Sequence, residues 1–145
     1  MSRRLRPQNS VGYRFAIVAS EYNSVIMDRL IAGAQRALKQ HEIKVIRVPG
    51  AFELPLAAKR AAKTVDAIVA LGCVLRGETP HFEYISAAAA NGLAHVALET
   101  GVPVGFGVLT VNTVEQAMQR SGESGNKGFE AATAALEMID VLRKI

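Results

Sequence analysis

The spacing of apolar residues changes repeatedly along this chain between two patterns. Short, nearly continuous apolar runs at residues 13–19, 43–48, 67–75 and 104–109 predict buried β-strands. Between and after them, apolar residues recur every three to four positions, which predicts helices over residues 24–40, 54–63, 80–100, 113–120 and 129–142. Strands therefore alternate with helices, and this order predicts an α/β fold whose central four-stranded parallel sheet is covered by helices on both faces.

Capping residues place the starts of several helices. Threonine is a good N-cap and proline suits the first helical position, so Thr79 and Pro80 predict a helix that begins at Pro80. Asn23 is the expected N-cap of the first helix. Thr113 and Gln116 have the spacing of a capping box.

Ligands of parallel α/β sheets bind outside the carboxyl ends of the strands, which here are followed by residues 20–23, 49–53, 76–81 and 110–112. The segment Gly77-Glu78-Thr79 brings backbone N–H groups to the start of a helix, a geometry that attracts anions and phosphate above all. His81 follows in the first turn, and an imidazole can transfer protons at physiological pH. The sequence thus predicts an anion site beside a group that transfers protons.

The net charge of +4 changes this picture little. Without Arg3, Arg4 and Arg6, the 17 Lys and Arg fall to 14 against 13 Asp and Glu, with no basic stripe, so nucleic acid is not an expected partner. These arginines lie in residues 1–12, an expected flexible tail before a single domain over residues 13–145. No apolar run approaches a membrane span, no signal peptide is evident, and the lone Cys73 fits a reducing compartment, so we expect a cytoplasmic protein without a membrane partner.

Common cofactor motifs are missing from the sequence. Gly105-Phe-Gly107 starts like a dinucleotide-binding fingerprint, but Thr110 stands where the third glycine belongs. There is no GxxxxGK[ST] phosphate loop, no histidine and acid spacing that suggests zinc, and no clustered aspartates as in response regulators. Glu21-Tyr22 also differs from the Ser/Thr/Gly-rich loop of a flavodoxin-type cofactor site. We therefore expect neither a metal nor a cofactor.

Four segments together carry a specific resemblance, although no single one would. They are Val48-Pro-Gly-Ala-Phe-Glu-Leu-Pro55, Gly72-Cys-Val-Leu-Arg-Gly-Glu-Thr-Pro-His81, Phe106-Gly-Val-Leu-Thr110 and Gly125-Asn-Lys-Gly128. In this order and spacing, from about Tyr13 to the C-terminus, the chain resembles the 6,7-dimethyl-8-ribityllumazine synthases of riboflavin biosynthesis. The resemblance implies a flavodoxin-like three-layer αβα sandwich. It also implies a transferase that condenses 5-amino-6-(D-ribitylamino)uracil with 3,4-dihydroxy-2-butanone 4-phosphate and releases phosphate and water, without a metal or redox cofactor.

The resemblance also implies roles for individual residues. His81 becomes the catalytic acid–base group, and Arg120 binds the substrate phosphate together with the amides of Glu78 and Thr79. Tyr22 stacks on the pyrimidine at a position that is usually Phe or Trp in the family. The other implied substrate contacts are Asn23 at the pyrimidine, the ribityl-binding segment Gly50, Ala51, Phe52 and Glu53, the backbone of Val74 and Leu75 at the ring edge, and Phe106 and Lys127 from a neighbouring subunit. Without the resemblance, each of these residues also has an ordinary structural interpretation, such as a helix cap, a solvated charge or a core aromatic.

A site shared between subunits implies a homo-pentamer, with pentamers assembling into an icosahedral shell and riboflavin synthase as a candidate partner. The loop between Arg120 and Asn126 is slightly shorter than in the shell-forming members and lacks their lysine. Two other hypotheses stay open at this point, namely a flavin or lumazine binder without turnover and a shell protein whose site is no longer active. The presence of His81, Arg120 and Lys127 favours the enzyme, because a binder needs no proton transfer.

Overall fold

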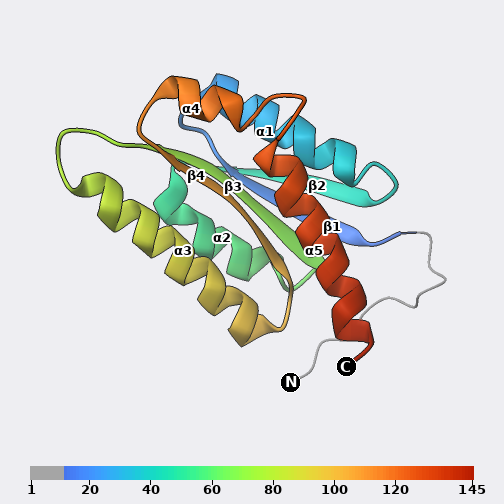
Figure 1. Cartoon of the computed structure of the whole chain (residues 1–145). Helices are drawn as coiled ribbons and strands as arrows, with labels where there is room; N and C mark the ends of the chain where they lie inside the picture. Colours follow the sequence, from blue (N-terminus) through green and yellow to red (C-terminus); the bar gives the residue numbers. More distant parts are fainter. Residues whose placement is uncertain (1–11) are drawn as a thin grey trace.

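The structure is a computed structural model that describes residues 12–145 (Figure 1). The expected tail, residues 1–12, lies outside the described residues apart from Gly12. The elements in chain order are β1 (Arg14–Ser20), α1 (Ser24–Ala37), β2 (Glu42–Val48), the 3-10 turn η1 (Ala51–Glu53), α2 (Leu54–Ala61), β3 (Ala67–Leu75), α3 (His81–Thr100), β4 (Val104–Val111), α4 (Val114–Gln119) and α5 (Lys127–Arg143).

The four strands form one parallel sheet in the order β2-β1-β3-β4. The chain therefore moves outward from β1 to β2, returns to the other side of β1 to form β3, and continues outward to β4. The gap between the carboxyl ends of β1 and β3 is the topological switch point, where open α/β sheets bind their ligands. The strand order thus places the centre of a site between two of the four carboxyl ends predicted from the sequence, those of β1 and β3.

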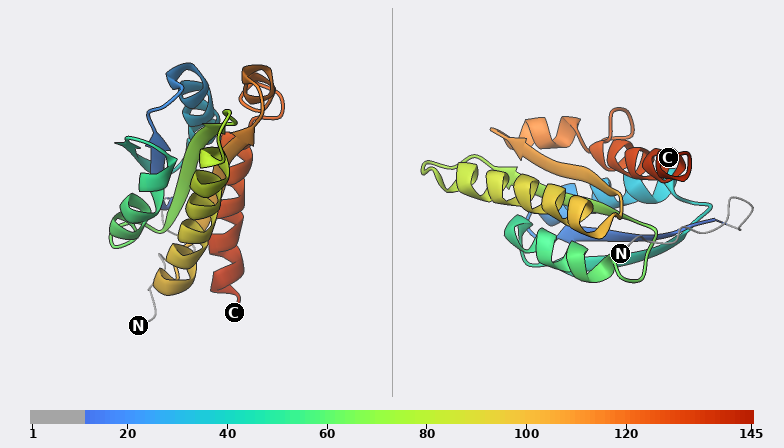
Figure 2. Two further views of the ribbon diagram at one scale, coloured as in Figure 1. Left: turned by 90° about the vertical axis from the view of Figure 1, so that its left-hand side faces the viewer. Right: turned by 90° about the horizontal axis from the view of Figure 1, so that it is seen from below.

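Two helical layers cover the sheet (Figures 1 and 2). Along β1, Phe15 and Ile17 pack against α1 and α5, while Ala16 and Val18 pack against α2 and α3. Alternate side chains of a strand point to opposite faces, so a strand buried on both faces has the continuous apolar run seen in the sequence. The predicted α/β fold, a three-layer αβα sandwich of flavodoxin-like type, is confirmed.

Two glycines allow the backbone of α5 to pack directly against β4 and α1. A Cβ atom on Gly105 of β4 would overlap the Ala131 carbonyl of α5, and one on Gly128 of α5 would overlap the Leu30 carbonyl of α1. Gly105 therefore serves the contact between β4 and α5, which explains why a fragment of a nucleotide fingerprint occurs without the rest of that motif.

The start of α3 corrects one expectation. The helix begins at His81, and the Pro80 carbonyl accepts hydrogen bonds from the amides of Glu83 (3.0 Å) and Tyr84 (3.4 Å). No side chain caps this end, so Thr79 is not the N-cap and Pro80 is not the first helical residue. Pro80 itself takes the capping position, with φ −71° and ψ 3°, and this leaves the Thr79 hydroxyl available for other contacts.

The other helix starts confirm two expected N-cap positions and add one that the sequence analysis missed. Asn23 occupies the N-cap of α1 with a left-handed backbone (φ 62°), but its side chain makes no capping bond. The Thr113 hydroxyl accepts from the Gln116 amide at 3.2 Å, as predicted, whereas the Gln116 side chain accepts from the Asn112 amide at 2.7 Å. Asn126 caps α5 through Phe129 N–H at 3.0 Å, so that helix starts two residues earlier than Phe129.

Among the described residues, no helix has both the length and the apolar character that crossing a membrane requires.

His41 fastens the beginning of β1 to the loop between α1 and β2. Its Nδ1 accepts the Tyr13 backbone N–H at 2.9 Å, and its ring stacks on Tyr13 and meets the edge of Phe15. Arg143 of α5 donates to the Tyr13 hydroxyl and lies over the same ring. Burial lowers the pKa of His41, and a protonated Nδ1 would lose its hydrogen bond with the Tyr13 amide.

We predict that His41 makes stability fall with acidification. The pKa is lower in the folded chain than the ordinary value of 6.5, so the unfolded state binds its proton first as the pH drops. The free energy of unfolding should therefore decrease below about pH 6.5. His41→Asn keeps an acceptor near the Nδ1 position but does not titrate, so its melting temperature should change less between about pH 8 and about pH 5. Parallel pH profiles for the parent and the variant would contradict this role.

Candidate active site

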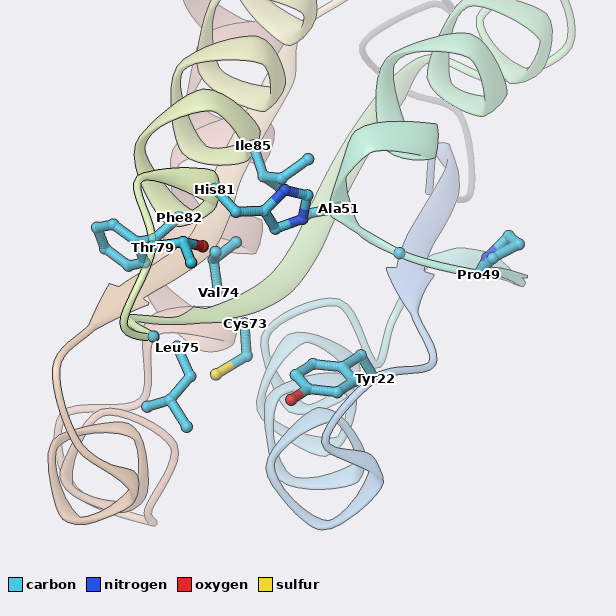
Figure 3. Close-up of a pocket in the computed structure, with 12 residues that line it drawn as sticks. Tyr22, Pro49, Ala51, Cys73, Val74, Leu75, Thr79, His81, Phe82 and Ile85 are labelled. Carbon is cyan, nitrogen blue, oxygen red and sulfur yellow. The ribbon is translucent and has the colours of Figure 1, made fainter.

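A cavity of about 420 Å³ opens at the switch point between β1 and β3 (Figure 3). It is enclosed by the loops that follow β1, β2 and β3 and by the first turns of α3. Its lining residues are Tyr22, Pro49, Gly50, Ala51, Cys73, Val74, Leu75, Gly77, Thr79, His81, Phe82 and Ile85. Loops at three of the four predicted strand ends therefore meet in one cavity.

The unequal lengths of the strands create this cavity. β1 pairs with β3 only as far as Ala19 opposite Leu71, whereas β3 continues to Leu75 and is held there by Val111 of β4. Beyond Leu71, the edge of β3 that faces β1 has no strand partner. Backbone groups on such an edge can bind a planar ligand with polar edges much as they would bind another strand. This geometry suits the contacts predicted for the backbone of Val74 and Leu75.

The loop between β3 and α3 presents free amides next to the cavity. Gly77, Glu78 and Thr79 are exposed, and none of their N–H groups donates a backbone hydrogen bond to another described residue. Gly77 and Thr79 line the cavity, whereas Glu78 does not. Because the positive end of α3 begins directly after this loop, the arrangement fits the predicted anion site.

His81 lies on the cavity wall formed by α3. In Figure 3 its imidazole points across the cavity toward Ala51, with Ile85 beside it. Ile85 follows His81 by one helical turn and therefore shares its face of the helix. The sequence analysis missed Ile85 and Phe82 as cavity residues, although the spacing from His81 contained the signal for Ile85.

Tyr22 stands at the opposite rim of the cavity with 60% of its surface exposed. The left-handed backbone of Asn23 turns the chain sharply after it, a conformation that asparagine adopts more readily than most residues. The Asn23 side chain does not line the cavity, and its buried amide lies against the Cys73 thiol. An exposed tyrosine ring on a constrained turn provides a flat surface on which an aromatic ligand can stack.

Cys73 forms part of the wall but has the character of a core residue. It is buried, and burial raises the pKa of its thiol, with a smaller opposing effect from the Asn23 amide. A thiol with a raised pKa is a poor nucleophile at neutral pH, which agrees with its interpretation as a small core residue.

The segment assigned to the ribityl chain is only partly directed into the cavity. Gly50 and Ala51 line it, but Phe52 is 60% exposed and Glu53 is half-buried outside the lining. Glu53 N–H donates to the Gly50 carbonyl at 3.2 Å, which closes the η1 turn. The structure therefore brings two of these four residues to the cavity and keeps the other two beside it.

Phe106, Arg120 and Lys127 line a different pocket of about 290 Å³, along β4 and the start of α5. Phe106 is 49% exposed, the Arg120 guanidinium donates to the Gln116 carbonyl at 3.0 Å, and Lys127 pairs with Glu130 at 3.1 Å. The expected grouping of Arg120 with the amides of Glu78 and Thr79 is therefore not formed within one chain. Instead, Arg120 shares a pocket with the two residues expected to serve a neighbouring subunit.

The described residues contain no group of three or more His, Cys, Asp or Glu side chains that could hold a metal ion. The chemistry available at the cavity is that of free backbone amides, an imidazole and an exposed aromatic ring.

An α/β sandwich with a cavity, free backbone amides and a histidine at its switch point is typical of proteins that bind small molecules there. The sequence model of the 6,7-dimethyl-8-ribityllumazine synthase family matches residues 12–143. A protein of Syntrophus aciditrophicus (strain SB), named 6,7-dimethyl-8-ribityllumazine synthase, is 51% identical over 142 residues, which cover 92% of each chain. The chain belongs to the 6,7-dimethyl-8-ribityllumazine synthase family.

Proposed function

We propose that the cavity at the switch point, completed by Phe106, Arg120 and Lys127 of a second copy, is the site of the family's condensation. The reaction joins 5-amino-6-(D-ribitylamino)uracil to 3,4-dihydroxy-2-butanone 4-phosphate and gives 6,7-dimethyl-8-ribityllumazine, phosphate and water, in riboflavin biosynthesis. The observation that carries the proposal is the division of the candidate residues between two separate pockets of one chain.

The half-site at the cavity holds the reacting groups. The free amides of Glu78 and Thr79 bind the phosphate, and His81 beside them transfers protons as the amine attacks the ketone, water leaves and phosphate is eliminated. Tyr22 stacks on the pyrimidine, with Asn23 next to it, while the backbone of Val74 and Leu75 meets the polar edge of the ring. The ribityl chain extends along the segment from Gly50 to Glu53.

The second half-site adds charge and an aromatic surface. Arg120 approaches the phosphate on the loop of the next subunit rather than on its own, and its planar guanidinium can donate two parallel hydrogen bonds to phosphate oxygens. Lys127 contributes a second cation, and Phe106 covers the ring system. This arrangement accounts for an exposed phenylalanine and for two cations that lie away from the anion loop of their own chain.

Contacts of this head-to-tail kind close into a ring, and we propose a homo-pentamer of single-domain chains. Small residues of α3 support close helix packing between subunits, because Ala90, Ala94 and Ala97 form a shallow groove beside Phe106. We also propose that the pentamers assemble into an icosahedral shell. The protein would associate with riboflavin synthase and lie in the cytoplasm.

His81→Ala should lower kcat by up to about 100-fold, the lower range of general acid–base contributions, because parts of this condensation proceed unaided. The KM values of both substrates should change little. The matched control is His95→Ala, an exposed histidine further along α3 that contacts Glu99 and does not line the cavity. Turnover is measured by lumazine absorbance. An unchanged kcat in His81→Ala would exclude His81 as the proton-transfer group.

Arg120→Ala should weaken binding of the butanone phosphate far more than binding of the pyrimidine. Loss of a charge-assisted contact costs about 2–3 kcal/mol, and lysine should restore only part of it, since an ammonium group lacks the planar pair of donors. Separate titrations of the two substrates, with exposed Arg36→Ala as the control, provide the measurement. An equal loss of affinity for both substrates would argue against a phosphate role.

The shared site predicts complementation between two inactive variants. One variant carries Phe106→Ala, Arg120→Ala and Lys127→Ala, and the other carries Tyr22→Ala and His81→Ala. When the two chains are unfolded and reassembled together, some sites should contain every residue intact, and part of the parent activity should return. Mixed assemblies that are verified by native mass spectrometry but stay inactive would refute the shared site.

A further inference from the structure

Arg76 ties together three elements at the edge of the cavity. It is the first residue after β3, and its backbone N–H donates to the Val111 carbonyl at the end of β4 at 2.8 Å. Its Nε donates to Asn112 Oδ1 at 2.9 Å. Its guanidinium lies 4.7 Å from the centre of the Phe82 ring, and Nη1 is 3.8 Å from Glu83. One side chain therefore connects the β3–α3 loop, the β4–α4 turn and the first turn of α3.

The Asn112 end of this contact is itself fixed. The Asn112 backbone N–H donates to Gln116 Oε1 at 2.7 Å, and Gln116 N–H donates to the Thr113 hydroxyl at 3.2 Å. The Gln116 carbonyl in turn accepts from the Arg120 guanidinium at 3.0 Å. The turn that holds Arg76 is thus part of the same hydrogen-bonded segment as Arg120.

Arg76 directly precedes residues 77–79, a loop segment that makes few contacts of its own. Gly77, Glu78 and Thr79 are exposed, and their amides make no backbone hydrogen bonds with other described residues. Within residues 77–79, the conformation therefore depends on what holds its two ends. Arg76 holds one end by its backbone and side chain, and it holds the other end by covering Phe82, the neighbour of His81.

We propose that Arg76 is a positioning residue that, through Asn112 and Phe82, keeps the β3–α3 loop in its anion-binding conformation before substrate arrives. This proposal rests on the proposed function, because it assumes that the loop receives the phosphate of the butanone substrate. Arg76 does not line the cavity, so its effect passes through the loop. Without the contacts of Arg76 with Asn112 and Phe82, substrate binding would have to order the loop. That entropic cost would reduce the affinity for the phosphorylated substrate alone.

The planar guanidinium is essential to this role. It can lie over an aromatic ring and donate from its edge at the same time, whereas a lysine ammonium makes point contacts and cannot satisfy both partners. The exposed pair with Glu83, at 3.8 Å, should contribute little. The contact with Asn112 is therefore the one to remove.

The test compares Arg76→Ala, Arg76→Lys, Asn112→Ala and the double variant Arg76→Ala/Asn112→Ala. Asn112→Ala removes only the side chain and keeps the backbone N–H that Gln116 accepts. The matched control is Lys59→Ala, which removes another exposed ion pair to α3, the one between Lys59 and Glu99 at 2.8 Å. The measurements are KM for each substrate, kcat, and hydrogen exchange in the free protein of the amides of residues 76, 83 and 84, which are hydrogen-bonded at the two ends of the loop.

We expect the KM of the butanone phosphate to rise about 10-fold in all four variants, with the double variant no worse than either alanine variant alone. The KM of the pyrimidine and kcat should stay within about twofold of the parent, and amide exchange at residues 76, 83 and 84 should become faster. Lys59→Ala should match the parent in every measurement.

Three results would overturn the positioning role: a parent-like Asn112→Ala, full rescue by Arg76→Lys, or equal effects on both substrates. The first would mean that Arg76 acts without Asn112, the second that only its charge matters, and the third that the protein is loosened generally. Failure of the proposed function would be seen in different variants, because His81→Ala and Arg120→Ala would then have the kinetics of the parent. Hydrogen exchange would still show whether Arg76 orders the loop.

Discussion

The extension of β3 beyond β1 is the constraint on which the rest of this structure depends. Strand order puts the two strands side by side at the switch point, and β1 stops pairing at Ala19 while β3 continues to Leu75. A strand with an unpaired edge needs support from its other side, and β4 supplies it as far as Val111. The same extension of β4 provides the carbonyl that accepts the Arg76 backbone N–H, so the cavity and the β3–α3 loop beside it depend on the same pair of strands.

The second pocket depends on a different constraint, the close packing of α5 against β4 and α1. Gly33 leaves room for the Asn126 side chain, whose amide donates to the carbonyls of Arg29 (3.1 Å) and Ser121 (3.0 Å). Lys127 N–H donates to the Arg120 carbonyl at 2.8 Å. The two cations of this pocket are therefore fixed to each other through the backbone, although their side chains belong to different helical segments.

The sequence was sufficient for features that depend on local patterns. Apolar spacing predicted every strand and the helices between them, and residue type after β3 predicted a ligand site at residues 77–81, whereas Tyr22 was assigned by the family resemblance. The structure brings Tyr22, Thr79 and His81 to one cavity. Features that depend on tertiary contacts were out of reach. Strand order is not encoded in any single stretch of the sequence. The grouping of Arg120 with Phe106 and Lys127 depends on how α4 and α5 fold back on β4. The predicted N-cap Thr79 was wrong because Pro80 occupies the N-cap position of α3.

In the proposed shared site, the exposed aromatic side chains would serve both substrate binding and subunit contact. Tyr22 lines the cavity, Phe52 lies beside it without lining it, and Phe106 lines the other pocket. Each of these rings is about half exposed or more in the single chain. Exposed aromatic surface of this kind is stabilised when it is buried against a partner or a ligand. In the proposed shared site, the rings that contact the substrate also lie where the subunits meet. Substrate binding and subunit association would then remove the same surfaces from water, so each should strengthen the other.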